Sequence, residues 1–155
     1  MKIRILTNGK IENHNVQNLV DMYLRRLQHY LPTVMQSIKA GKLKYTADSQ
    51  ILEQEGNKLL EQLSDSDYTI VLEKSGKQYT SIEFAQLFNQ LARRSLKQVT
   101  FVIGGPIGLS EGVKHQADLL LSFSQMTFPH ELSVVLLAEQ LYRAQSILRG
   151  EKYHK

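Results

Sequence analysis

The chain has 155 residues, and its 19 Lys and Arg outnumber its 15 Asp and Glu to give a net charge of +4, which permits a polyanionic partner without requiring one. It contains no cysteine, which excludes disulfides and thiolate metal sites and suits a reducing compartment. No apolar run approaches the ~20 residues that cross a bilayer, so we expect one soluble, cytoplasmic domain over residues 1–155 with no membrane partner.

The first half of the chain alternates strand and helix patterns, with a strand over 2–7, a helix over 16–31, a strand over 33–38 and a helix over 48–63. Asn15 suits the N-cap of the first helix, and Pro32 ends it. Asp48 or Ser49 is predicted to cap the second helix, in which Gly56 indicates close packing. A basic loop precedes that helix and carries Lys39, Lys42 and Lys44.

The second half continues the alternation, with a strand over 68–73, a helix over 80–94, a strand over 99–103, a short helix over 110–117, a strand over 119–123 and a helix over 130–148. Residues 75–77 are predicted to turn the chain. Thr80 and Glu83 have the spacing of a capping box, and Pro129 suits the first turn of the last helix. Strands that alternate with helices predict a three-layer α/β domain with a mainly parallel sheet.

Two of these strands are followed by loops of unusual composition. Parallel strands deliver their loops to the carboxyl edge of the sheet, where ligands bind in open α/β folds. The first loop, Gly104-Gly105-Pro106-Ile107-Gly108, lacks the spacing of a dinucleotide or phosphate loop. Taken alone, it fits a tight strand-to-helix turn as well as a site where backbone approaches a ligand.

The second loop, over 124–128, carries Met126 and Phe128 among hydroxyl residues and a Gln. Such a loop can enclose a flat apolar ring such as adenine, with backbone hydrogen bonds at the ring's edges. Taken alone, however, Met126 and Phe128 are better explained as side chains that pack into the core.

The remaining polar residues indicate neither a metal site nor a covalent nucleophile. His130 is either a base or a packed helix residue, and Arg143 follows Glu139 at the spacing of an ordinary intrahelical ion pair. The last helix is apolar over a wide arc, which favours burial beneath a second chain as well as its own. The tail over 149–155 fits either a frayed end or an RNA contact, because Tyr153 and His154 stand among positive charges.

Four motifs in fixed order resemble one family: FVIGGPIGLS at 101–110, LSFSQMTFPH at 121–130, EQLYRA at 139–144 and the terminal RGEKYHK. With AGK at 40–42, the EG pair at 55–56 and the total length, the chain resembles the RlmH family of SPOUT-superfamily methyltransferases. The resemblance implies a homodimer, a C-terminal trefoil knot, S-adenosylmethionine as methyl donor and no metal. It also implies methylation of N3 of a pseudouridine in 23S rRNA of the assembled ribosome. Separately, the small size and modest positive charge predict recognition of a folded ribosomal surface and not of a free oligonucleotide.

The resemblance also implies roles for individual residues. Its cofactor contacts fall on Leu72, Gly104, Phe123, Ser124, Gln125, Met126, Thr127 and Phe128. Catalysis and RNA binding are implied for Arg143, Tyr153 and His154, with His154 as the candidate base.

One position departs from the family pattern. Relatives usually have Arg where this chain has Val134, so a contact of that Arg with RNA or a partner subunit would be lost or moved. Two other functions stay open at this point. One is a SPOUT methyltransferase that acts on tRNA or another rRNA site, and the other is a non-catalytic ribosome-binding factor, which Val134 favours weakly.

Overall fold

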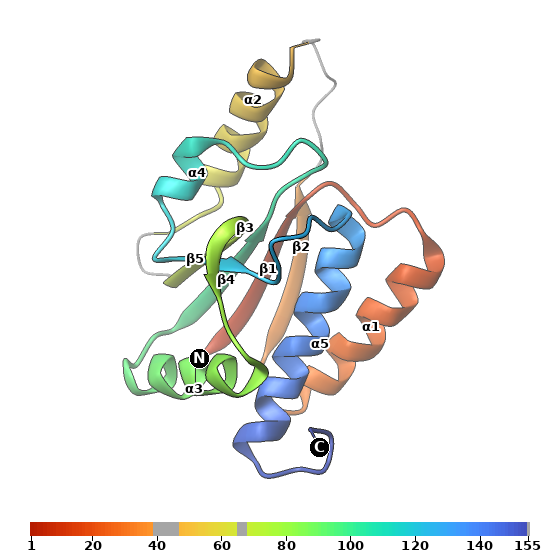
Figure 1. Cartoon of the computed structure of the whole chain (residues 1–155), viewed down its shortest axis with the longest axis vertical. Coiled ribbons are helices and arrows are strands. Elements are labelled where there is room, and N and C mark those ends of the chain that lie inside the picture. Colours follow the sequence, from red (N-terminus) through yellow and green to blue (C-terminus); the bar gives the residue numbers. More distant parts are fainter. Residues whose placement is uncertain (39–46, 65–67, 155) are drawn as a thin grey trace.

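The computed structural model describes residues 1–38, 47–64 and 68–154. Its strands form one parallel sheet in the order β2-β1-β4-β3-β5 (Figure 1). The strands are β1 Lys2–Asn8, β2 Thr33–Ile38, β3 Tyr68–Gln78, β4 Gln98–Ile103 and β5 Leu119–Ser122. The predicted parallel sheet is therefore confirmed.

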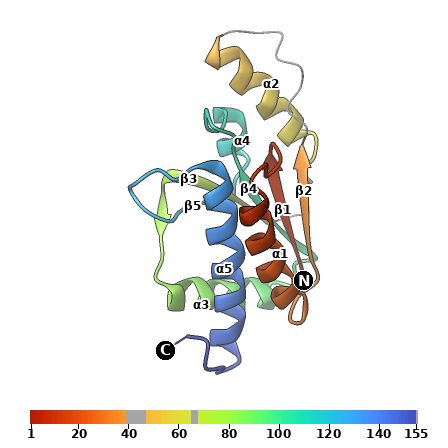
Figure 2. The same ribbon diagram turned by 90° about the vertical axis from the view of Figure 1, so that its right-hand side faces the viewer.

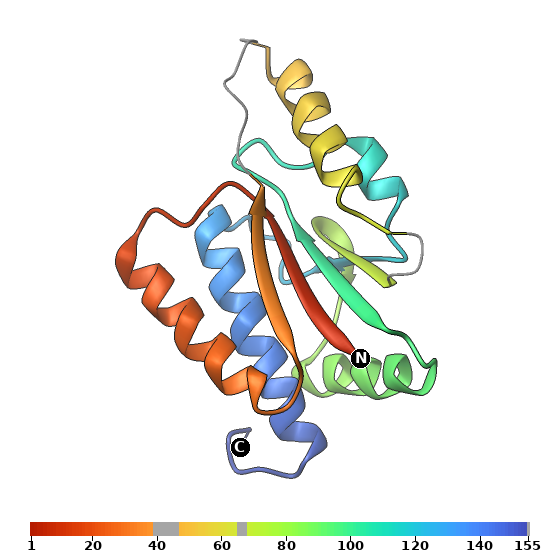
Figure 3. The same cartoon turned by 180° about the vertical axis from the view of Figure 1, so that it is seen from behind.

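Helices cover both faces of the sheet. They are α1 His14–Gln28, α2 Asp48–Leu60, α3 Ser81–Arg93, α4 Glu111–His115 and α5 His130–Leu148. Figure 2 shows α1 and α5 side by side along the sheet, and Figure 3 shows α2 and α4 together beyond the tips of the central strands. The trefoil knot that the family resemblance implies stays a prediction.

The alternation of apolar residues along the strands explains the three layers. Ile3, Ile5 and Phe101 point to one face and pack in a cluster with α1, α3 and α5. Leu6 and Val102 point to the opposite face and pack in a second cluster with α2 and α4. Successive strand residues face opposite sides of a sheet, so each central strand contributes to both clusters and is buried on both faces.

The helix starts differ from two of the predicted caps. Asn13, not Asn15, caps α1, since its side chain accepts from the backbone N–H of Asn15 and Val16. The carboxylate of Glu131 holds the backbone N–H groups of Glu12 and Asn13, which fixes the chain for an earlier start. The cap position of α2 is Ala47, so neither predicted residue caps that helix.

Other local predictions are confirmed or corrected. The capping box of Thr80 and Glu83 is formed, and a Cβ added at Gly56 would overlap the side chain of Ser110, as its predicted close packing requires. β3 runs beyond the predicted turn at 75–77, with a register shift between Leu72 and Lys77 that lets the strand rejoin β5. The predicted basic loop with Lys39, Lys42 and Lys44 lies outside the described residues.

Candidate functional site

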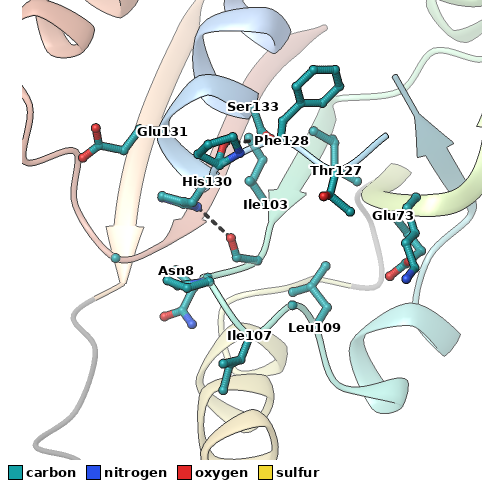
Figure 4. Close-up of a pocket in the computed structure, with 18 of the residues that line it drawn as sticks. Asn8, Glu73, Ile103, Ile107, Leu109, Thr127, Phe128, His130, Glu131 and Ser133 are labelled. Carbon is teal, nitrogen blue, oxygen red and sulfur yellow. Dashed lines mark hydrogen bonds between the residues drawn. The ribbon is translucent and has the colours of Figure 1, made fainter. Parts of the chain in front are cut away.

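A cleft of about 1340 Å³ lies at the carboxyl edge of the sheet (Figure 4). The neighbouring strands β4 and β5 end here, followed by Gly104 and Phe123, and β3 passes beside them with Leu72 at its register shift; all three residues line the cleft. The loop after β1 and the start of α5 line it as well. The carboxyl edge therefore carries a cleft where the sequence predicted a ligand.

Most of the predicted cofactor residues line this cleft. They are Leu72, Gly104, Phe123, Ser124, Met126, Thr127 and Phe128. Gln125 does not line it, although it is exposed in the same loop. The structure thus brings seven of the eight together, and their role in cofactor binding stays a prediction.

The glycine loop after β4 combines both properties that its sequence left open. It forms a tight turn, in which the N–H of Gly108 donates to the carbonyl of Gly105 at 3.0 Å. A Cβ added at Gly104 would lie 2.6 Å from the carbonyl oxygen of Gly108 and 2.7 Å from Cγ of Leu109. Only glycine therefore fits at position 104, where bare backbone faces the cleft.

The loop over 124–128 projects its apolar side chains outward. Met126 is 75% exposed and Phe128 is 38% exposed, so the prediction that they pack into the core is wrong. The side chain of Ser124 accepts from the N–H of Met126 at 3.0 Å and holds the loop away from the sheet. Among the described residues, the N–H groups of Gln125, Thr127 and Phe128 have no protein acceptor. The loop thus offers both an apolar surface and free backbone donors.

His130 connects the two loops. Its Nδ1 lies 2.7 Å from the carbonyl oxygen of Gly104, as the dashed line in Figure 4 marks. A carbonyl only accepts, so Nδ1 carries the proton and donates. The Nε2 atom is buried and has no partner in the described part of the chain. His130 is therefore part of the site and holds the glycine loop against the start of α5.

The sequence did not single out several charged residues of the cleft. Lys114 of α4 pairs with Glu73 at 3.2 Å and with Glu111 at 2.9 Å. The pKa of Lys114 is raised, first by its hydrogen bond to Glu111, so its ammonium stays charged. Glu73 is the last residue of the strand predicted over 68–73, and that position could have indicated it as a candidate site residue. Lys114 comes from a helix whose packing no local pattern specifies.

A second cluster lies at the other end of α5 and unites the three predicted catalytic residues. The carboxylate of Glu139 accepts from Nε of Arg143 at 2.9 Å and from the hydroxyl of Tyr153 at 3.0 Å. The guanidinium of Arg143 lies 4.8 Å from the centre of the Tyr153 ring. Its Nη1 also lies 3.4 Å from Nδ1 of His154. The tail is therefore folded back onto its helix, and the prediction of a frayed end is wrong.

The protonation states of this cluster follow from its contacts. Burial raises the pKa of Tyr153, and its hydrogen bond to Glu139 adds to the effect, so this residue remains a phenol. Arg143 only donates hydrogen bonds, so Nδ1 of His154 accepts and carries no proton in this contact. Tyr153 therefore donates its proton to Glu139, while His154 accepts from Arg143.

The cleft and the cluster around Glu139 lie far apart within one chain. At a rise of about 1.5 Å per residue, α5 separates His130 from Arg143 by about 20 Å. Figure 1 shows the C-terminus at the opposite end of α5 from the carboxyl edge of the sheet. A single chain therefore does not bring Arg143, Tyr153 and His154 to the cleft.

Val134 lies fully buried in the chain's own core. The side chain of Val134 packs in the cluster between the sheet and α5 and has no exposed surface on this chain. The departure from Arg at this position therefore gives no support to a non-catalytic factor.

Residues 1–38, 47–64 and 68–154 contain no group of three or more His, Cys, Asp or Glu side chains placed to hold a metal ion. None of their helices combines the length and the apolar character that crossing a membrane demands.

Comparison with known proteins gives the family. A profile described as "Predicted SPOUT methyltransferase" matches residues 1–154. The ribosomal RNA large subunit methyltransferase H of Natranaerobius thermophilus is 40% identical over an alignment of 158 positions that covers 99% of each chain. The protein of that name from Syntrophobacter fumaroxidans is 40% identical over an alignment of 157 positions that covers both chains completely. The chain belongs to the SPOUT methyltransferases, in the large subunit methyltransferase H family.

Solved structures agree with this SPOUT fold. A probable methylase family protein from Haemophilus influenzae matches with a TM-score of 0.55 at 14% identity, over 99% of this chain and 70% of its own. The A. aeolicus TrmH/SpoU tRNA modifying enzyme matches with a TM-score of 0.50 at 18% identity, over 96% of this chain and 76% of its own. At such identities the likeness concerns the fold alone.

Proposed function

We propose that this SPOUT methyltransferase is a cytoplasmic homodimer that transfers a methyl group from S-adenosylmethionine to N3 of a pseudouridine in 23S rRNA of the assembled ribosome. The named relatives support rRNA of the large subunit as the substrate, since they match this chain from end to end. One observation supports the proposal most strongly. The groups suited to a cofactor line the cleft, and the groups suited to an acceptor base lie in the tail cluster, at opposite ends of α5.

The cleft suits the adenosyl part of the cofactor. Met126 and Phe128 offer apolar contacts, and the free N–H groups of the same loop suit the edges of an adenine ring. Gly104 exposes backbone beside them. When bound, S-adenosylmethionine supplies an electrophilic methyl group. The residues of the cleft fix the position of that group, and positioning is a large part of catalysis when two reactants must meet in line.

The tail cluster suits the acceptor base. N3 of a pseudouridine carries a proton that must leave. His154 is the candidate base, and its Nδ1 must first release the contact with Arg143 before it accepts that proton. The pKa of Arg143 is raised, first by its hydrogen bond to Glu139, so its guanidinium stays charged and stabilises negative charge that develops on the ring. Tyr153 presents an aromatic ring to the nucleotide, with Lys152 exposed beside it.

A homodimer supplies the missing half of each site. If two copies of α5 run antiparallel, the tail of one subunit reaches the cleft of the other. The helix carries exposed or half-buried apolar residues for such a contact, among them Leu132 at 42% exposure and Leu148 at 40%. The site is then incomplete without the partner copy.

Hybrid dimers test this arrangement. One variant carries Gly104→Ala and the other is truncated after Gly150, so each should have little activity alone when S-adenosylmethionine saturates the wild-type cleft but not the Gly104→Ala cleft. A refolded equal mixture contains hybrids with one intact cleft facing one intact tail, and we expect about a quarter of wild-type ribosome methylation. A mixture as inactive as its components, or a fully active monomer, would contradict the shared site.

The substrate is tested separately. Ribosomes from a strain that lacks this protein, mapped by mass spectrometry before and after treatment with it, should gain one methyl group on a 23S rRNA pseudouridine. A methyl group gained on tRNA or at another rRNA position would contradict the proposed substrate and identify a different one. Calorimetry with S-adenosylmethionine distinguishes an enzyme from a non-catalytic ribosome-binding factor, which need not bind the cofactor.

A further inference from the structure

A cluster of tyrosines and arginines lies where the end of α1 meets α5 and the tail. Its members are Tyr23, Tyr30, Tyr142, Tyr153, Arg26, Arg143 and Arg149. The ring of Tyr142 is central, with its centre 4.7 Å from that of Tyr153 and 6.0 Å from that of Tyr30. Three separate segments of the chain thus meet through aromatic rings.

Two arginines of this cluster are exposed and rest on these rings. The guanidinium of Arg26 lies 5.8 Å from the centre of the Tyr23 ring and 5.7 Å from that of Tyr142. The guanidinium of Arg149 lies 4.5 Å from the centre of the Tyr30 ring. Such contacts hold a flexible side chain in place while its N–H groups stay accessible.

Neither Arg26 nor Arg149 has a carboxylate partner in the described residues, whose ion pairs involve only Lys114 and Arg143. Nη1 of Arg149 donates to the backbone carbonyl and to the side-chain Oε1 of Gln145. The carboxylates of the cluster are already occupied, because Glu139 accepts from Arg143 and Tyr153, while Glu151 accepts from the hydroxyl of Tyr30 at 2.7 Å. Two guanidinium groups are therefore oriented and not neutralised.

We propose that Arg26 and Arg149 bind backbone phosphates of the substrate RNA beside the target nucleotide. A planar guanidinium with free N–H groups matches the oxygens of a phosphate, and placement on rings reduces the entropy lost on binding. Arg149 shares its segment with Tyr153 and His154, so the RNA held here runs past the candidate catalytic residues. This inference rests on the proposed function and adds two phosphate contacts to it.

Arg25 provides a matched control, because it is the exposed neighbour of Arg26 on α1 and contacts no ring among the described residues. Arg26→Ala, Arg149→Ala and Arg25→Ala each remove one positive charge from the same end of the molecule. We expect the first two to lower kcat/KM on ribosomes about tenfold and to reduce the slope of its logarithm against log salt by about 0.7 each. Arg25→Ala should stay within about twofold of wild type.

Arg26→Lys keeps the charge and loses the planar fork, so it should fall between wild type and Arg26→Ala. Calorimetry with S-adenosylmethionine should give the same affinity for all four variants, which separates RNA binding from damage to the cleft. Equal losses in Arg26→Ala and Arg25→Ala, or a loss with an unchanged salt slope, would overturn the inference. A wild-type protein that is inactive on ribosomes would overturn the proposed function together with it.

Discussion

The two ends of α5 carry different kinds of site. At its start, residues of β3, residues at the ends of β4 and β5, and two loops surround a cleft, and His130 joins the helix to Gly104 by a hydrogen bond. At its end, side chains make the site, since Glu139 gathers Arg143 and Tyr153 from the helix and the tail. The cleft at the first end suits a ligand that is enclosed by backbone, such as the proposed cofactor. The side chains at the second end suit a ligand that is bound by charged groups, such as the proposed RNA.

This difference explains how so small a chain can bind two large reactants. The sheet fixes the backbone of the cleft rigidly, because β4 and β3 are buried on both faces. The tail cluster depends on a few side-chain contacts at the end of one helix, and it lies about 20 Å from the cleft. Changes at the first end should therefore affect cofactor affinity, and changes at the second should affect methyl transfer.

Removal of the tail should have the largest effect. A protein truncated after Gly150 lacks Tyr153 and His154, so it loses the candidate base and both contacts of Arg143 with the tail. We expect methylation of ribosomes to fall about 10³-fold, in line with the loss of a positioned base, while calorimetry shows unchanged affinity for S-adenosylmethionine. Full activity of the truncated protein would remove the tail from the mechanism.

A change at the cleft should give the opposite pattern. Gly104→Ala places a Cβ 2.6 Å from the carbonyl oxygen of Gly108, so the loop must shift. We expect cofactor affinity to fall about 100-fold, which is about 2.7 kcal/mol. Gly112→Ala is the control, because its Cβ lies at an ordinary 3.5 Å from Leu60 and outside the cleft lining. Equal affinities of the two variants in calorimetry would show that backbone at position 104 does not contact the cofactor.

The two glutamates of α5 allow a smaller and more symmetrical test. Glu139→Gln weakens the hold on Arg143 and Tyr153, and we expect kcat on ribosomes to fall about tenfold at unchanged cofactor affinity. Glu131→Gln weakens the hold on the backbone N–H of Glu12 beside the cleft, and it should weaken cofactor binding a few-fold instead. Identical effects of the two changes on both quantities would contradict the division between the ends.

The fold could be predicted from the sequence because its signals are local. Short apolar runs in the sequence indicate the buried strands. The observed bounds of α5, His130 and Leu148, agree with the predicted helix over 130–148. Errors arose where a distant residue decides the outcome. Glu131 sets the start of α1 from far along the chain, and contact with β5 extends β3 beyond its predicted turn. No local pattern contains either partner.

The site was predictable to the extent that it lies at strand ends. Gly104 and the loop over 124–128 follow buried strands, and the parallel sheet brings them together. The exposure of Met126 was missed, because an apolar residue in a loop is usually buried. The distance between the tail and the cleft within one chain could not be predicted from local sequence patterns, since packing alone determines the order of the strands and the direction of α5.

The smallest expected effect concerns how the tail is held. The pKa of Tyr30 is raised from 10.0 to about 12, first by its hydrogen bond to Glu151. Since the folded state keeps this proton more tightly than the unfolded state, Tyr30 adds stability that is complete below pH 10 and is lost as the pH rises toward about 12.

Tyr30→Phe should lower the free energy of unfolding by about 0.5–1 kcal/mol at pH 8. Urea unfolding at fixed protein concentration should show that this difference shrinks above pH 10, because the Tyr30 hydroxyl then loses the proton that it donates to Glu151. A difference that is independent of pH would mean that the hydrogen bond to Glu151 does not anchor the tail.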